Sequence, residues 1–476
     1  LKTINTHRVL GCSIYKLRAI SLIESIVICL ISYILALFIV NDLSYTPIAN
    51  WVDADIRLSQ YKGLILLTAL IAILTGCLAG LYPAIRSTSY APALVLKGSF
   101  GLSPKGKKVR VALIGFQYTV SIALIIVTLF MGLQNHFMTS SEQLGFNKDQ
   151  VAIVNLTPEI YAKHKPQYIQ KLKDYPGIED VAFSVYELSK EDDMIDLEYA
   201  RHEDKDVFFK VFYASENFLS VMDIQVEEGR DFTREDLNKA QSDYIINPAA
   251  ERDFHLHPGD RFNDRTVLGV SKDFRFNSCR IASSPFVFAL NNDIPNPKLV
   301  SYIRFNSKTN LQEAVAHVRE TLKEIDPTFP FEISFYNTIL NNLYQKEQTL
   351  GKLISLFGIM AILISIVGVF GLVLFETQYR RKEIGIRKIN GATTGQILLM
   401  FNKTYIRIVS VCFIISIPIA WMGTQQWLEN FAYKTPLHLW VFIVAFLIIL
   451  SVTIGTVTFR NWQAANENPV NSVKSE

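Results

Sequence analysis

Long uninterrupted runs of apolar residues are the main pattern in this sequence. A helix needs about 20 apolar residues to cross the hydrocarbon core of a bilayer. Six runs approach or exceed that length: 20–40, 63–85, 111–133, 353–375, 406–424 and 438–459. Helices in the cores of soluble proteins have shorter apolar stretches. The pattern therefore predicts six transmembrane helices.

Charged residues divide the connections between these runs into two kinds. Segment 86–110 carries six Lys or Arg residues and no acid, and segment 376–405 carries six against two Glu. The alternate connections, 41–62 and 425–437, are nearly neutral and contain Trp and Tyr, which favour the membrane interface. Because short basic loops stay on the cytoplasmic side, the two basic segments and both chain ends are predicted to face the cytoplasm. The large region between the third and fourth runs is then predicted to lie outside.

Composition agrees with a membrane protein and adds little else. Hydrophobic residues make up 50% of the 476 residues and charged residues 19%, whereas soluble domains carry about 25% charge. A net charge of +3 is too small to indicate nucleic acid as a partner. Of the five cysteines, three lie in apolar runs, so the sequence contains no disulfide framework.

The outer region, 134–352, mixes strand and helix patterns. Strand patterns occupy 151–156 (VAIVNL) and 206–214 (DVFFKVFYA), and a long helical pattern occupies 310–325. Residues 134–143 and 336–352 are predicted to continue the flanking spans outward as a helical stalk. The predicted fold class is an α-helical transmembrane protein with six spans and one α+β extracytoplasmic domain.

The chain contains an internal repeat at an offset of 380 residues. Residues 7–40 fall on 387–420, and Gly11 meets Gly391. Each copy consists of a basic segment, a glycine, a span, an outer loop, a second span and a polar segment with proline. Repeats of this parallel kind are common in transporters.

The second basic segment, RRKEIGIRKINGATTGQ, has the spacing of a short amphipathic helix. Glu383 and Arg387 are four residues apart, in the favourable order for a helical ion pair. Ile386 and Ile389 are three apart and form a short apolar stripe. The segment is therefore predicted to lie along the membrane surface.

A turn and a new helix are predicted directly after this amphipathic helix. Gly391 is suited to end a helix in a left-handed conformation, and Thr393 with Gln396 fits a capping box that begins the next helix. The alternative is a positive-inside anchor, which needs charge but neither the glycine nor the cap.

Several short motifs occur in an order typical of one family. They are EIGIRKINGAT (383–393), LGFNKDQVAIVNL (144–156), EGRDF (228–232), IINPAAERDF (245–254), VLGVSKDFRFNS (267–278) and the tail WQAANENPVNSVK (462–474). Together they resemble the FtsX-like and MacB-like permeases of ATP-binding-cassette (ABC) systems. In that family the first motif is the cytoplasmic coupling helix that contacts the ATPase subunit.

The resemblance implies a set of ATPase-coupling residues. In the second copy of the repeat they are Glu383, Ile384, Gly385, Ile386, Arg387, Lys388, Gly391, Ala392 and Thr393. In the first copy they are His7, Arg8 and Gly11, and the match there is looser because Cys12 replaces the usual alanine.

Large members of that family have eight spans in two four-span units. This chain is expected to lack the first span, the first outer domain and the second span, and its start, at Leu1, is expected to be missing. The predicted order is a first coupling segment (1–19), two spans (20–85), a basic linker (86–110), a span (111–133), an outer domain with its stalk (134–352), a span (353–375), a second coupling segment (376–405), two spans (406–459) and a cytoplasmic tail (460–476).

Three stretches imitate sites without completing them. GLSPKGKK (101–108) is close to a phosphate-binding loop, but Lys108 stands where the loop requires Ser or Thr. His255 and His257 form a weak metal pattern that is better explained as a surface turn, and 191–206 is expected to be an acidic, solvated loop. The sequence predicts no catalytic residue, no metal site and no cofactor.

Two functions of different classes remain open. The first is the permease subunit of an ABC complex in the cytoplasmic (inner) membrane, exporting a peptide, drug or lipoprotein-type substrate. The second is a membrane sensor that regulates an outer partner and transports nothing. Expected partners are a dimeric ABC ATPase, membrane lipid and either a periplasmic adaptor or another permease copy, but no nucleic acid.

Overall fold

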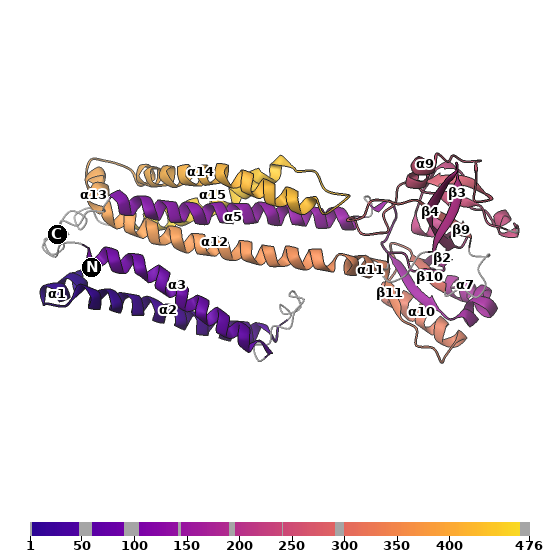
Figure 1. Cartoon of the computed structure of the whole chain (residues 1–476), viewed down its shortest axis with the longest axis horizontal. Helices are drawn as coiled ribbons and strands as arrows, with labels where there is room; N and C mark the ends of the chain where they lie inside the picture. Colours follow the sequence, from indigo (N-terminus) through magenta and orange to yellow (C-terminus); the bar gives the residue numbers. More distant parts are fainter. Residues whose placement is uncertain are drawn as a thin grey trace. The chain divides into compact units, whose positions relative to one another are not determined.

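The computed structural model describes residues 2–46, 60–89, 104–140, 144–189, 196–239, 241–290 and 299–466. They form two compact units. The membrane unit contains the residues up to 128, 349–421 and those from 438 onward, and the sheet unit contains 129–348 and 422–437. The chain passes between the two units at four places, within or beside long helices (Figure 1).

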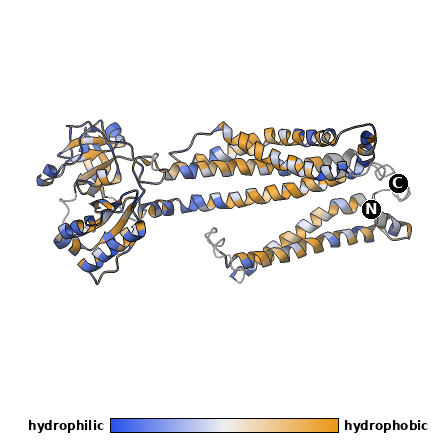
Figure 2. Cartoon of the chain, turned by 180° about the vertical axis from the view of Figure 1, so that it is seen from behind, coloured by the Kyte–Doolittle hydropathy of each residue, from blue (hydrophilic) through white to orange (hydrophobic). Residues whose placement is uncertain are grey.

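All six predicted spans are helical, and each belongs to a helix at least as long as the apolar run. These helices are α2 (Ile14–Leu43), α3 (Lys62–Thr88), α5 (Pro104–Thr139), α12 (Gln345–Tyr379), α14 (Thr394–Leu428) and α15 (Leu439–Asn466). Each is long and apolar enough to cross a membrane, and Figure 2 shows hydrophobic colour along them. Pro418 lies inside α14 without ending it, as is tolerated in transmembrane helices.

Helices α2 and α3 approach each other closely through two glycines four residues apart. A Cβ atom on Gly76 would lie 2.9 Å from the Cα of Ile26, and one on Gly80 would lie 2.7 Å from Ser25 Oγ. Small residues at this spacing allow membrane helices to pack backbone against backbone. The pair is further joined by Tyr33, whose hydroxyl donates to the Ile65 carbonyl at 2.7 Å.

Buried hydroxyl pairs join α5 to its neighbours α12 and α15. Ser121 and Ser365 Oγ atoms are 2.9 Å apart, and Thr453 Oγ1 lies 2.9 Å from the Tyr118 hydroxyl. Such interhelical hydrogen bonds are worth roughly 0.6 kcal/mol each in membranes. They define the register of three spans whose apolar side chains alone would allow sliding.

The sheet unit is built on a mixed sheet, which confirms the predicted α+β domain. Its strands are β1 (Val151–Leu156), β2 (Ile178–Ser184), β3 (Asp196–His202), β4 (Lys205–Ala214), β5 (Val226–Gly229), β6 (Tyr244–Ile246), β7 (Arg261–Phe262), β8 (Arg265–Ser271), β9 (Phe286–Leu290), β10 (Leu299–Phe305) and β11 (Ile333–Phe335). The order is β11-β1-β10-β2-β4-β9-β6-β8-β5, with β3 beside β4 and β7 beside β8. Strand β4 pairs with β9 in parallel and with β3 antiparallel.

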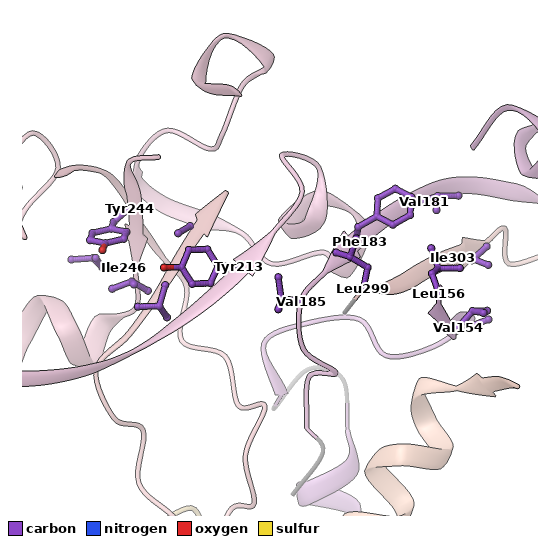
Figure 3. Packing of buried hydrophobic residues seen from close by; sticks show 14 of the residues in the cluster. Val154, Leu156, Val181, Phe183, Val185, Tyr213, Tyr244, Ile246, Leu299 and Ile303 are labelled. Atoms are coloured by element: carbon purple, nitrogen blue, oxygen red, sulfur yellow. The ribbon is translucent and has the colours of Figure 1, made fainter. Parts of the chain in front are cut away.

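Helices cover the sheet, and both of its faces are buried. The helices are a π-helix (Ile160–His164), α7 (Lys165–Lys173), α8 (Phe218–Met222), a 3₁₀-helix (Arg234–Asn238), α9 (Pro248–Phe254), α10 (Leu311–Ile325) and α11 (Tyr336–Leu343). Along β1, Val154 and Leu156 belong to one apolar cluster, while Val151 and Ile153 belong to the other. Figure 3 shows Val154 and Leu156 beside labelled residues of β2 and β10 in the first cluster.

Two details differ from the sequence-based expectation. The loop predicted over 191–206 is wrong from residue 196 onward, because β3 and β4 form a hairpin with Glu203 and Asp204 at positive φ. Residues 191–195 lie outside the described part. The stalk helix predicted over 336–352 is interrupted at Tyr344, which separates α11 from α12. Its hydroxyl is buried and donates to Cys279 Sγ at 3.3 Å.

Candidate coupling site

The second coupling segment forms a short helix, a turn and the start of a long helix. Helix α13 spans Arg381–Ile389 and α14 begins at Thr394. We call residues 381–396 the second elbow. Glu383 Oε1 accepts from Arg387 Nη2 at 2.9 Å and from Arg387 Nε at 3.1 Å. The predicted ion pair is therefore present, although both side chains are about half exposed and such pairs contribute little stability.

Helix α13 has one buried face and one exposed face. Ile384 is 4% exposed and Gly385 is also buried, whereas Ile386 and Ile389 are 55% and 65% exposed. Exposed isoleucines beside basic residues are typical of a surface that a partner covers. This is the arrangement the apolar stripe predicted.

The turn after α13 has the predicted geometry. Gly391 has φ +88°, a left-handed conformation that glycine adopts without strain. The Ala392 amide donates to the Arg387 carbonyl at 2.9 Å, which closes the helix end. Thr393 N–H then donates to Gln396 Oε1 at 3.1 Å, and Gln396 N–H donates to Thr393 Oγ1 at 3.3 Å. The capping box is confirmed by this reciprocal pair of hydrogen bonds.

The first coupling segment repeats this turn at the offset of 380. Helix α1 (Lys2–Val9) leads to Gly11 at φ +92°, and the Cys12 amide donates to the His7 carbonyl at 3.0 Å. Ser13 begins α2 by accepting from the Lys16 amide. We call residues 2–16 the first elbow. Because the same hydrogen bond recurs 380 residues later, the repeat is one of structure as well as sequence.

The exposed residues of the first elbow are also apolar. Val9 is 61% exposed and Leu10 is 77% exposed. The elbow is bound to α3 through Arg8, whose Nη1 donates to the Thr88 carbonyl at 3.0 Å. Next to the elbow, Arg18 of α2 donates from Nε to Thr88 Oγ1 at 2.9 Å. An outside force on this elbow would therefore reach both α2 and α3.

The second elbow is bound to its helices by residues that the sequence reading missed. At the inner end of α12, Glu376 accepts from Arg380 Nη2 at 3.2 Å and from the Tyr405 hydroxyl of α14 at 3.3 Å. Thr377 Oγ1 donates to Asn461 Oδ1 of α15 at 2.8 Å. Buried polar contacts of this kind hold α12, α14 and α15 together where α13 leaves the bundle.

In the described part of the chain, neither the phosphate-loop-like stretch nor the pair His255 and His257 has the geometry of a binding site. From Pro104 onward the phosphate-loop-like stretch is helical and belongs to α5, so its amides cannot surround a phosphate; residues 101–103 lie outside the described residues. His257 Nδ1 lies 3.7 Å from Glu251 Oε1, and His255 ends α9. Among the described residues, no group of three metal-ligating side chains comes together.

Parts of the chain are similar to known membrane proteins. Residues 355–469 match the family described as FtsX-like permease C-terminal. The macrolide export ATP-binding/permease protein MacB of Aggregatibacter actinomycetemcomitans is 25% identical over 212 residues, which cover 42% of this chain and 32% of that protein. MacB of Neisseria gonorrhoeae is 25% identical over 223 residues, covering 44% and 34%. The alignments thus span about a third of these relatives.

Solved structures of outer domains from transporters also match part of the chain. The periplasmic region of MacB from Actinobacillus actinomycetemcomitans has 15% identity and a TM-score of 0.31, and the alignment covers 42% of this chain and 94% of that one. The extracellular domain of the ABC-type transporter YknZ from Gram-positive bacteria has 17% identity, a TM-score of 0.29 and coverage of 39% and 99%.

The six long apolar helices and the sheet domain fit a multi-pass membrane protein with a separate folded domain. Over part of its length the chain is similar to FtsX-like permeases and to MacB.

Proposed function

We propose that the chain is the membrane subunit of an ABC complex in the cytoplasmic membrane. A separate ATPase, bound at the first and second elbows, would convert ATP-driven closure into movement of the spans and of the sheet domain outside. The cargo class is a peptide, a drug or a lipoprotein-type substrate, as in export systems. The chain itself contributes docking and movement, and hydrolysis belongs to the partner.

One observation carries this proposal. Both elbows have the same left-handed glycine turn, closed by the same hydrogen bond, and both expose apolar side chains. A positive-inside anchor needs only charge, so it would account for neither feature. Arginine is enriched in binding hot spots, and Arg387 lies beside the exposed Ile386 and Ile389.

The test is co-purification of the full chain with its ATPase. The double variant Ile386→Asp with Arg387→Asp is expected to lower the amount of bound ATPase at least about tenfold, because it removes an apolar anchor and reverses a charge. Leu197→Asp is the control: Leu197 is also an exposed apolar residue, at 66% against the 55% of Ile386, but it lies in β3 of the sheet domain.

Two results would count against the docking role. One is unchanged ATPase binding and unchanged stimulation of ATP hydrolysis in the double variant. The other is an equal loss in the Leu197→Asp control, which would indicate a general defect. A chain that binds a ligand through its sheet domain but produces no flux would instead support the sensor function.

A further inference from the structure

The loop between α14 and α15 lies in the sheet unit. Residues 422–437 belong to the same compact unit as the sheet, although the helices on either side belong to the membrane unit. Phe431 is 3% exposed and lies in the same apolar cluster as the second face of the sheet. A loop that only connected two spans would be solvated, so its burial requires an explanation.

Tyr433 makes the central contacts of this loop. Its amide donates to the Cys279 carbonyl at 3.0 Å, and its hydroxyl accepts from the Ser283 amide at 3.0 Å. The Arg275 guanidinium lies 4.1 Å from the centre of its ring, a cation–π distance. One side chain and its backbone therefore hold the segment 275–283 at three points.

The same residue is bound to α5. Gln134, which is fully buried, donates from Nε2 to the Tyr433 carbonyl at 3.1 Å, and Gln134 Oε1 accepts from the Thr435 amide at 2.8 Å. Both polar groups of the glutamine amide are used on the loop. Because a buried amide without partners is costly, these two bonds specify the position of the loop on α5.

The start of α12 reaches the segment 275–283 from another direction. Arg280 Nε donates to Glu347 Oε1 at 2.8 Å, and the Arg280 guanidinium lies 5.0 Å from the Phe431 ring. The Cys279 amide donates to the Tyr344 hydroxyl at 3.1 Å, and burial raises the pKa of both the Cys279 thiol and the Tyr344 phenol. Burial at this contact thus favours the neutral thiol and the neutral phenol.

We propose that the α14–α15 loop is a third attachment of the spans to the sheet domain, with Tyr433 as its positioning residue. The end of α14 from Met422 and the loop up to Leu437 then move with the segment 275–283 as one body. Stalk helices α5 and α12 alone would leave α14 and α15 free of the sheet domain. The attachment itself follows from the contacts, whereas its role in ATP-driven movement rests on the proposed function.

Hydrogen exchange on the full chain in lipid nanodiscs tests the attachment without any ATPase. Tyr433→Ala is expected to raise exchange at residues 279–283 and 431–435 by about tenfold, because it removes the hydroxyl that accepts from the Ser283 amide and the ring that packs on Arg275, and so loosens the loop on the segment 275–283. Tyr433→Phe keeps the ring and the backbone bonds, so it should raise exchange at Ser283 alone. Tyr199→Ala is the control, because Tyr199 lies in the same domain but is 55% exposed.

Unchanged exchange at 279–283 in Tyr433→Ala would overturn the attachment. If that variant does not fold, Tyr433→Phe decides: an unchanged Ser283 amide overturns the proposal, and faster exchange confined to that amide supports it. A rise spread over the whole sheet in Tyr433→Phe would mean a general loss of stability and would also overturn it.

A second arm separates this inference from the proposed function. In the complex with the co-purified ATPase, ATP should change exchange in the sheet domain, and Tyr433→Ala should lose at least half of that change while ATPase binding stays intact. A full response in the variant overturns the transmission role. If the wild-type chain shows no response to ATP, the proposed function fails together with the transmission role, while the attachment is still decided by the partner-free exchange.

Discussion

Replacing Gly145 with alanine is expected to destabilise the sheet domain by about 3 kcal/mol. Gly145 has φ +77°, and a Cβ atom there would lie 2.1 Å from the Asp273 carbonyl oxygen and 3.0 Å from the Phe274 Cα. Both neighbours are backbone atoms, so neither can rotate away. Gly145 lies shortly before β1, and the two residues it contacts belong to the motif VLGVSKDFRFNS (267–278).

Gly259 provides a matched control for this substitution. It has φ +99°, but no atom lies within 4 Å of the position that a Cβ would take, so Gly259→Ala costs only the left-handed conformation, about 1 kcal/mol. Thermal unfolding followed by near-ultraviolet circular dichroism, together with limited proteolysis, measures both variants. Equal losses of stability for the two substitutions would show that the contact with Asp273 and Phe274 is not tight.

Replacing Arg380 with methionine is expected to destabilise the inner end of the membrane unit by about 3 kcal/mol. Its guanidinium lies 3.2 Å from Glu376 Oε1, and the Glu376 side chain is only 10% exposed. Removing this countercharge leaves a carboxylate that is expensive to bury. Equilibrium unfolding in detergent measures the loss, and faster trypsin cleavage after Lys388 reports release of α13.

The chain offers a control of the same kind seven residues away. Arg387 and Glu383 also form an Arg–Glu pair at a spacing of four, but their side chains are 53% and 42% exposed. Arg387→Met should therefore cost less than about 0.5 kcal/mol. Adding Glu376→Gln to Arg380→Met should restore more than half of the lost stability. If the two single Arg→Met variants are equally stable, burial of the Glu376 pair has no energetic consequence.

Local features of the second elbow could be predicted from the sequence because they depend on residues three to five apart. The pair Glu383–Arg387, the turn at Gly391 and the box of Thr393 with Gln396 are all of this kind, and each is present. The spans were predictable for a similar reason, because each one is recognised from the length of its own apolar run.

Contacts between distant parts of the chain could not be predicted in this way. Glu376 and Tyr405 are 29 residues apart, and Tyr433 contacts a segment about 150 residues earlier. Neither contact produces a regular local pattern of residues that could be recognised in the sequence. Strand β3 was missed because its apolar residues Leu197 and Tyr199 are exposed, whereas Glu198 faces Tyr213 and Tyr244, so the usual pattern of a buried apolar face is absent.

The central claim is that both elbows lie on the cytoplasmic side, where an ATPase can reach them, and that the sheet domain lies on the other side. Labelling with a membrane-impermeant thiol reagent tests it most directly. Single cysteines are introduced by Val9→Cys, Ile389→Cys or Ile281→Cys in a chain whose native cysteines are replaced by serine. All three positions are more than half exposed. The account predicts that positions 9 and 389 react only in inverted vesicles and position 281 only in right-side-out vesicles. Reaction of either elbow from the same side as position 281 would contradict it.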